Sequence, residues 1–253
     1  MRKTNYFFLL LLVQLLLACT TRDWPAALSP DEDGVGEGSV EVLLKGTPST
    51  QTRATTSTIT KEEADLFLVT ITKGDDIVAQ QKLLGKVGSM TFPAGYGYKV
   101  FVENITDVDA EEANEGWGAK RFTGLSKSFG IQAGQTSKVG VNCTVANAAI
   151  SVNMAEGVEG CTVTISNGSR TLTTDEGGKV AYFNVSSGVV AVILKVEKNG
   201  TVVIEQDFSL SAAQVKDGNL TPSESESEKG SLDLTITYND TFDVIPEEII
   251  IPE

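Results

Sequence analysis

Short segments in which apolar and polar residues alternate recur along most of this chain. Residues 39–45, 66–72, 77–84, 128–132 and 137–145 show the pattern, with many β-branched side chains. Such alternation is typical of strands with one buried face. Turn residues separate the segments at the short spacing of a β-sandwich. Because no helical period is sustained, the pattern predicts an all-β protein rather than parallel β-α-β units.

One helical turn is expected between the first two of these strands. Thr60 is followed three residues later by Glu63. In this arrangement, a capping box, each side chain pairs with the backbone N–H of the other residue. We therefore predict a single turn of helix that begins after Thr60.

The second half of the chain repeats the first. Val-Thr-Ile-Thr-Lys-Gly at 69–74 returns as Val-Thr-Ile-Ser-Asn-Gly at 163–168, and Phe-Gly-Ile-Gln-Ala at 129–133 returns as Phe-Ser-Leu-Ser-Ala at 208–212. Between them, a Phe, a glycine turn and a strand ending in Val-Glu also recur. Three similar segments that recur in the same order predict two tandem β-sandwich domains. Their expected bounds are 39–146 and 147–240.

The N-terminus has the features of a bacterial lipoprotein signal. It begins Met-Arg-Lys, continues with an apolar run at 7–17 and reaches Leu-Leu-Ala before Cys19. The run is too short to span a bilayer comfortably. We predict a signal peptide at 1–18, acylation of Cys19 by diacylglycerol and palmitate-type chains, and a flexible tether at 19–38. The alternatives are an ordinary signal peptide and a short membrane helix with an incidental cysteine.

Charge and composition exclude several classes of function. The net charge is −14, which disfavours nucleic acid and electrostatic docking on anionic lipid. Membrane attachment must then come from the acyl chains, each methylene of which contributes about 0.8 kcal/mol. The chain has no histidine, which removes Ser-His-Asp catalysis and His-ligated zinc. We predict a protein that is not an enzyme and that needs no cofactor beyond its lipid.

An acidic stretch interrupts the first copy and is absent from the second. It contains five carboxylates, Asp107, Asp109, Glu111, Glu112 and Glu115, and Trp117 closes it. One interpretation is a calcium site, since hard oxygen ligands gather there. A second is a glycan site in which Trp117 stacks on a sugar. The third, which we favour, is a solvated hairpin loop whose tryptophan covers an edge of the sandwich, without a metal.

Two further features leave alternatives open. Cys143 and Cys161 both alternate with apolar residues, and they either form a disulfide or lie apart as buried thiols. The tail at 241–253 alternates apolar and acidic residues. It either completes its own domain as a strand or adds to a sheet edge of a partner protein.

The order of these features resembles a known family. Gly-Ser-Val-Glu-Val-Leu at 38–43, Phe-Pro-Ala-Gly-Tyr at 92–96, Phe-Gly-Ile-Gln-Ala-Gly at 129–134 and the terminal Ile-Ile-Ile-Pro at 249–252 are similar to Bacteroidetes lipoproteins that carry a domain of unknown function. That family is akin to the fimbrillin-like proteins. The resemblance covers nearly the whole chain and implies two transthyretin-like, Greek-key sandwiches at the cell envelope and no enzyme activity.

The resemblance also implies a function. In fimbrillins a trypsin-like protease cuts after an arginine beyond the first strand, and Arg53 matches that position by context; the alternative is an arginine on a flexible surface segment. We expect an outer-membrane lipoprotein at the cell surface that acts as an adhesin or as a fimbrillin-like accessory or structural component. The alternative is a carbohydrate-binding surface lipoprotein that assists glycan capture.

Overall fold

The computed structural model describes residues 34–46, 60–222 and 232–239. The signal peptide, Cys19, Arg53 and the tail at 241–253 lie outside the described residues. Strands dominate the described chain, and the expected all-β class is confirmed. Within the same residues, none of the helices combines the length and apolar character needed to cross a membrane.

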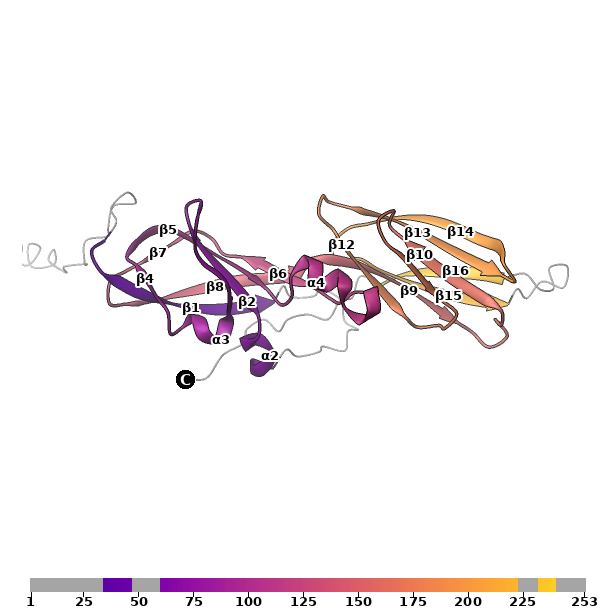
Figure 1. The fold of residues 1–253 in the computed structure, drawn as a ribbon, viewed down its shortest axis with the longest axis horizontal. Coiled ribbons are helices and arrows are strands. Elements are labelled where there is room, and N and C mark those ends of the chain that lie inside the picture. Colours follow the sequence, from indigo (N-terminus) through magenta and orange to yellow (C-terminus); the bar gives the residue numbers. More distant parts are fainter. Residues whose placement is uncertain (1–33, 47–59, 223–231, 240–253) are drawn as a thin grey trace, which may run out of the picture.

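The first half of the fold is one eight-stranded sheet (Figure 1). Its strands are β1 Glu37–Gly46, β2 Leu68–Lys73, β3 Asp76–Leu83, β4 Thr91–Pro93, β5 Gly95–Glu103, β6 Phe122–Leu125, β7 Phe129–Ile131 and β8 Thr136–Val145. They pair in the order β3-β2-β5-β6-β8-β1-β4, and β7 pairs with β5. Two short helices, α2 (Lys61–Asp65) and α3 (Leu84–Val87), lie in the connections. The five strands expected by alternation are confirmed to within a few residues at their ends, whereas β6 was not expected.

The second half consists of two four-stranded sheets, ordered β11-β10-β13-β14 and β12-β9-β15-β16. Together the two halves give an elongated molecule (Figure 1). The strands are β9 Asn147–Met154, β10 Cys161–Ser166, β11 Thr171–Thr174, β12 Val180–Asn184, β13 Val190–Lys198, β14 Thr201–Leu210, β15 Val215–Pro222 and β16 Leu232–Asn239.

The repeated sequence segments occupy equivalent places in the two halves. Val69 of β2 pairs with Val102 of β5, and Val163 of β10 pairs with Val196 of β13. The later repeated segment also occupies the same place in both halves, because Phe129 pairs with β5 and Phe208 pairs with β13. The parallel pairing of β1 with β8 likewise matches that of β9 with β15. Corresponding residues therefore make corresponding backbone contacts.

Two hydrophobic cores fill the two halves, and β9 contacts both. Ala148 and Ile150 belong to the second core, whereas Ala149, on the opposite face of the strand, belongs to the first. A strand buried on both faces loses the polar alternation of a half-exposed one. This explains why residues 147–152 are all buried. Since β8 ends at Val145 and β9 begins at Asn147, the chain passes from one core to the other without a linker.

The capping box is confirmed in atomic detail. The Thr60 backbone N–H donates to Glu63 Oε2 at 2.8 Å, and the Glu63 N–H donates to Thr60 Oγ1 at 3.2 Å. These bonds satisfy two backbone donors that the first turn of a helix leaves unpaired. Helix α2 starts where the sequence predicted it.

Candidate functional site at the junction of the two cores

The acidic stretch connects the antiparallel strands β5 and β6, as expected of a hairpin connection, but it is helical rather than an irregular loop. It forms α4 (Asp107–Glu112) and a 3-10 turn, η1 (Asn114–Gly116). Thr106 Oγ1 accepts a hydrogen bond from the Asp109 N–H at 3.1 Å and caps the helix. The carboxylates of Asp107 and Asp109 lie in the first turn, where the helix dipole favours negative charge. The Thr-x-x-Asp spacing was the signal in the sequence that could have predicted this helix.

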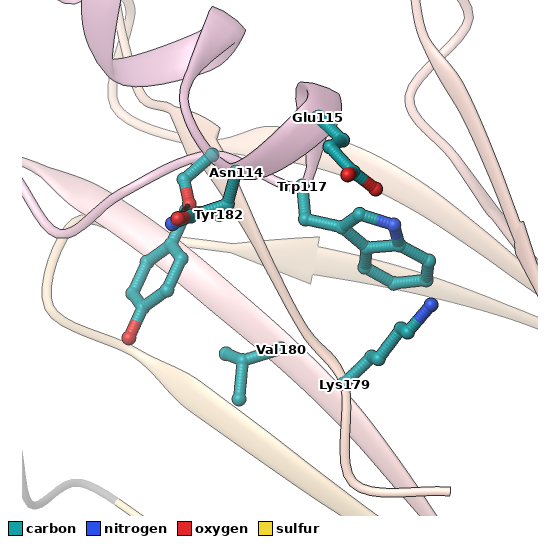
Figure 2. Close-up of a pocket in the computed structure, with 7 residues that line it drawn as sticks. Asn114, Glu115, Trp117, Lys179, Val180 and Tyr182 are labelled. Atoms are coloured by element: carbon teal, nitrogen blue, oxygen red, sulfur yellow. Dashed lines mark hydrogen bonds between the residues drawn. The ribbon is translucent and has the colours of Figure 1, made fainter. Parts of the chain in front are cut away.

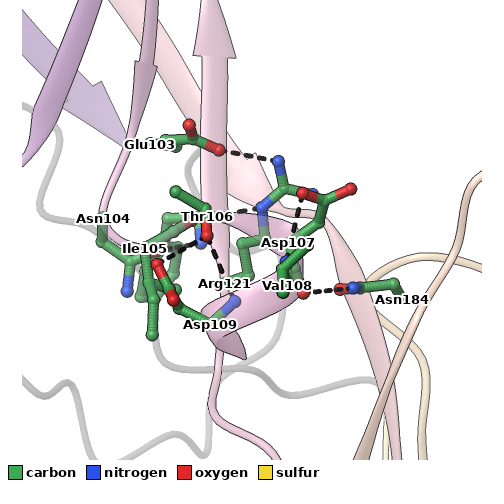
Figure 3. A network of polar contacts seen from close by, with 10 residues as sticks. Glu103, Asn104, Ile105, Thr106, Asp107, Val108, Asp109, Arg121 and Asn184 are labelled. Carbon is green, nitrogen blue, oxygen red and sulfur yellow. Dashed lines mark hydrogen bonds and ion pairs between the residues drawn. The ribbon is translucent and has the colours of Figure 1, made fainter. Parts of the chain in front are cut away.

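Three carbonyl groups tie this stretch, residues 107–118, to the second half of the fold. Asn184 Nδ2 donates to the Asp107 carbonyl at 2.7 Å (Figure 3). Arg170 Nη1 donates to the Glu111 carbonyl at 2.8 Å. The Tyr182 N–H donates to the Trp117 carbonyl at 2.8 Å. We call residues 107–118 the bridging segment, because they belong to the first half and bond to the second.

Arg170 anchors the C-terminal end of α4. Its guanidinium lies over the Phe183 ring, 4.7 Å from the centroid, and also donates to the Tyr182 carbonyl. Burial lowers the pKa of Arg170, while the charge of Glu111 opposes that shift. A cation at the last carbonyls of a helix is favourable, since the dipole is negative there.

On the side of the first half, a buried ion pair supports the start of the bridging segment. Arg121 Nη2 lies 2.7 Å from Glu103 Oε2, and the two side chains are only 17% and 9% exposed. Arg121 Nε also donates to the Ile105 carbonyl at 3.3 Å (Figure 3). Nearby, Asn104 Oδ1 accepts from the Phe122 N–H and its Nδ2 donates to the Lys120 carbonyl. The two ends of the insertion are thereby fastened together.

Gly118 marks the point where the bridging segment crosses β12. A Cβ atom there would lie 3.0 Å from Tyr182 Cβ and from the Tyr182 carbonyl oxygen. The residue also has φ +85°, a region in which only glycine is unstrained. Close approach and backbone conformation both require glycine.

A pocket of about 530 Å³ opens beside this crossing (Figure 2). Asn114, Glu115 and Trp117 line it from the bridging segment, and Lys179, Val180 and Tyr182 line it from the second half. Val180 and Tyr182 lie on the face of β12 opposite Ala181 and Phe183, which belong to the second core. On that face Val180 is exposed, whereas Tyr182 is partly buried and packs against the first core. Lys179 Nζ lies 5.5 Å from the centroid of the Trp117 ring.

The structure separates the predicted acidic residues from the predicted tryptophan. Asp107, Asp109 and Glu112 are exposed on α4, and Glu111 is half-buried. None of these four residues lines the pocket, whereas Glu115, the fifth acidic residue of the stretch, does. Within the described residues, no three side chains of the ligating types gather around a potential metal position, so the calcium interpretation gains no support.

Sequence reasoning found Trp117 but missed the residues of the second half that the bridging segment contacts. Arg170, Lys179, Tyr182 and Asn184 lie far along the chain, in the second copy. Nothing in their local sequence points to the bridging segment. The one available signal in the sequence was the insertion itself. Because the second copy lacks such a segment, one surface of that copy is left free, and the insertion of the first copy can cover it.

The two cysteines do not form a disulfide. Cys143 belongs to the first core and Cys161 to the second, and both are free, buried thiols. Burial raises the pKa of Cys143 to about 12. The disulfide alternative is therefore wrong, and the alternative of two separate buried thiols describes the structure.

A family model described as a domain of unknown function (DUF4493) matches residues 36–253. The chain belongs to this family. The match confirms the resemblance to proteins that carry a domain of unknown function. No curated protein sequence matches the chain at a significant level.

Several solved structures are similar to the chain. The fimbrial anchor protein Mfa2 from Porphyromonas gingivalis is 11% identical, with a TM-score of 0.41, and the match covers 82% of this chain and 99% of that protein. A fimbrial assembly protein from Parabacteroides distasonis is 12% identical, with a TM-score of 0.40 and coverage of 82% and 100%. A Bacteroides uniformis protein, described provisionally as a cell adhesion protein, is 12% identical, with a TM-score of 0.43 and coverage of 83% and 99%.

Proposed function

We propose that the protein is a non-enzymatic, fimbrillin-like component of the cell surface, held in the outer membrane by lipid on Cys19. Its role is adhesion or a structural part of a surface fibre. The observation that carries this proposal is the bridging segment, which fastens two β-cores end to end through hydrogen bonds at three carbonyls. A braced, elongated β-protein suits a tethered surface component that must hold its shape under load.

The proposed architecture is two tandem sandwiches, 39–146 and 147–240, of transthyretin-like, Greek-key type. The equivalent strand registers of the two halves support the duplication. The sharing of β9 between the two cores supports a boundary that is packed rather than hinged. The tether at 19–38 then sets the distance of the first sandwich from the membrane.

The proposed protein partners bind by strand addition. Among the described strands, β14 pairs only with β13, and Val202 and Val203 on it are exposed. An edge strand that exposes apolar residues favours pairing with another chain. The tail at 241–253 would supply such a strand to a neighbour, so deletion of 241–253 should remove oligomer ladders on gels while leaving a folded monomer. Ladders that persist would rule out the tail as the donor.

Protease shaving of intact cells tests surface display and processing together. Trypsin should release the protein from whole cells, and mass spectrometry of the detergent-extracted protein should find Cys19 as the acylated N-terminus. In protein extracted from cells that were never exposed to trypsin, a second N-terminus at residue 54 would establish cleavage after Arg53. Protein that resists shaving on intact cells but not on lysed cells would contradict surface display.

Capture of glycans is the second candidate function. The pocket beside Trp117 favours it, because an aromatic ring and several polar groups converge there. This role is compatible with surface display, and its test is binding by the purified protein.

A further inference from the structure

We infer that the pocket beside Trp117 binds one neutral pyranose unit of a glycan, and that both halves of the fold must be in place to form it. The inference rests on the proposed surface role and gives that role a ligand and a site. The volume of about 530 Å³ lies in the range of about 300–1,000 Å³ that is usual for small-molecule sites.

The lining supplies what a sugar ring requires. Figure 2 shows Val180 between the rings of Trp117 and Tyr182. The face of an aromatic ring carries partial negative charge, and the axial C–H groups of a pyranose carry partial positive charge, so the two surfaces attract. The rings therefore provide a platform, and Asn114, Glu115 and Lys179 at the rim offer hydrogen-bonding groups to the hydroxyls.

The charges of the rim point to a neutral ligand. Lys179 contributes one positive charge, but its Nζ lies 3.7 Å from Glu176 Oε2 and also contacts the Trp117 ring. Glu115 contributes one negative charge. Since these two carboxylates outnumber the one lysine, the pocket has no excess of positive potential to select a sulfated or sialylated sugar.

The backbone holds the platform in place before a ligand arrives. Asn114 and Glu115 have φ of 52° and 59°, a conformation that is uncommon for residues with a side chain. Residues held in such strained conformations concentrate at functional sites. The hydrogen bond from the Tyr182 N–H to the Trp117 carbonyl, at 2.8 Å, fixes the spacing between the two aromatic residues. A preformed site loses little conformational entropy on binding.

Fluorescence titration of the full-length protein in detergent tests the site directly. The chain has two tryptophans, Trp24 and Trp117, so a Trp24→Phe background leaves Trp117 as the single reporter. The probes are methyl glycosides of neutral hexoses, N-acetylhexosamines, N-acetylneuraminic acid and a sulfated oligosaccharide. We expect at least one neutral glycoside to give a saturable change. Tyr182→Ala should weaken it about tenfold, and the matched variant Tyr96→Ala, in the first half, should leave it unchanged.

A second variant keeps the test decisive if Tyr182→Ala does not fold. Val180 is partly exposed, so Val180→Gln replaces the apolar surface between the two rings with a longer polar side chain without disturbing a core, and it should weaken the same signal about tenfold. The inference is overturned if no neutral glycoside gives a saturable change, if the change survives both variants, or if the charged sugars bind in preference. Because the titration uses purified protein, its failure leaves surface display untouched, and a failure of shaving leaves the titration valid.

Discussion

At the scale of single residues, Asn147 is the polar group on which the junction depends most. It is 1% exposed. Its Nδ2 donates to the Ala119 carbonyl at 2.7 Å, and its Oδ1 accepts from the Arg121 N–H at 3.2 Å. Asn147, the first residue of β9, thus holds the segment through which the insertion leads back into β6. A buried polar group with both partners satisfied fixes one geometry, because every alternative leaves groups unpaired.

Replacing Asn147 should therefore destabilise the protein strongly. Asn147→Ala leaves a buried N–H and a buried carbonyl without partners, and we expect a loss of about 2–3 kcal/mol in the free energy of unfolding. Asn153→Ala, on the exposed end of the same strand, should cost less than about 0.5 kcal/mol. Urea denaturation of both variants measures the difference. Equal losses would show that Asn147 has no special role at the junction.

The pKa of Cys143 predicts how stability depends on alkaline pH. Burial raises this pKa from 9.0 to about 12, so between these values the unfolded chain releases the thiol proton and the folded chain keeps it. The unfolded state then binds fewer protons, and the contribution of Cys143 to stability falls as pH rises through that window. In the folded protein at pH 8, Cys143 should resist iodoacetamide and react only after denaturation. Rapid alkylation of the native protein would contradict its burial.

At the scale of elements, the bridging segment is what distinguishes the first half from the second. In the second half, β13 and β14 are joined by Asn199 and Gly200 alone. In the first half, the equivalent connection between β5 and β6 is expanded into α4, η1 and Trp117. The same connection is therefore a tight turn in the second half, whereas in the first half it is a longer segment that contacts the second half.

Gly118 allows a clean test of the crossing. Gly118→Ala adds a Cβ within 3.0 Å of Tyr182 atoms, whereas Gly188→Ala, at nearly the same φ of +84°, meets nothing within 4 Å. The control should cost about 1 kcal/mol from backbone strain alone. Gly118→Ala should cost about 1 kcal/mol more, and thermal unfolding would reveal it. Identical melting temperatures for the two variants would mean that the bridging segment does not press on β12.

The sequence predicted those features that are decided locally. Alternation located most strands, and the Thr60 and Glu63 pair predicted α2, because each signal lies within a few residues of the structure that it specifies. The cap of α4 was equally local but was outweighed by the acidic composition around it. The partners of Trp117 could not be predicted, since Lys179 and Tyr182 meet it only after two halves have folded and packed. A disulfide remained open for the same reason, because spacing does not reveal that Cys143 and Cys161 enter different cores.

At the scale of the whole molecule, the contacts predict that the two halves unfold as one unit. The cores share β9, and the bridging segment spans both. Domains joined only by a flexible linker move and open independently, whereas a packed and hydrogen-bonded junction couples their stabilities. The pocket beside Trp117 and the rigidity proposed for a surface component both depend on this coupling.

Native-state hydrogen exchange measures that coupling most directly. In the wild-type protein, the slowest amides of β5 and β13 should exchange with the same free energy of opening. Replacing residues 105–119 with the Asn-Gly turn of the second half should separate the two values by about 1–2 kcal/mol or more, while both halves stay folded. Different opening energies in the wild type, or equal ones after the replacement, would contradict a bridging segment that couples the two β-cores.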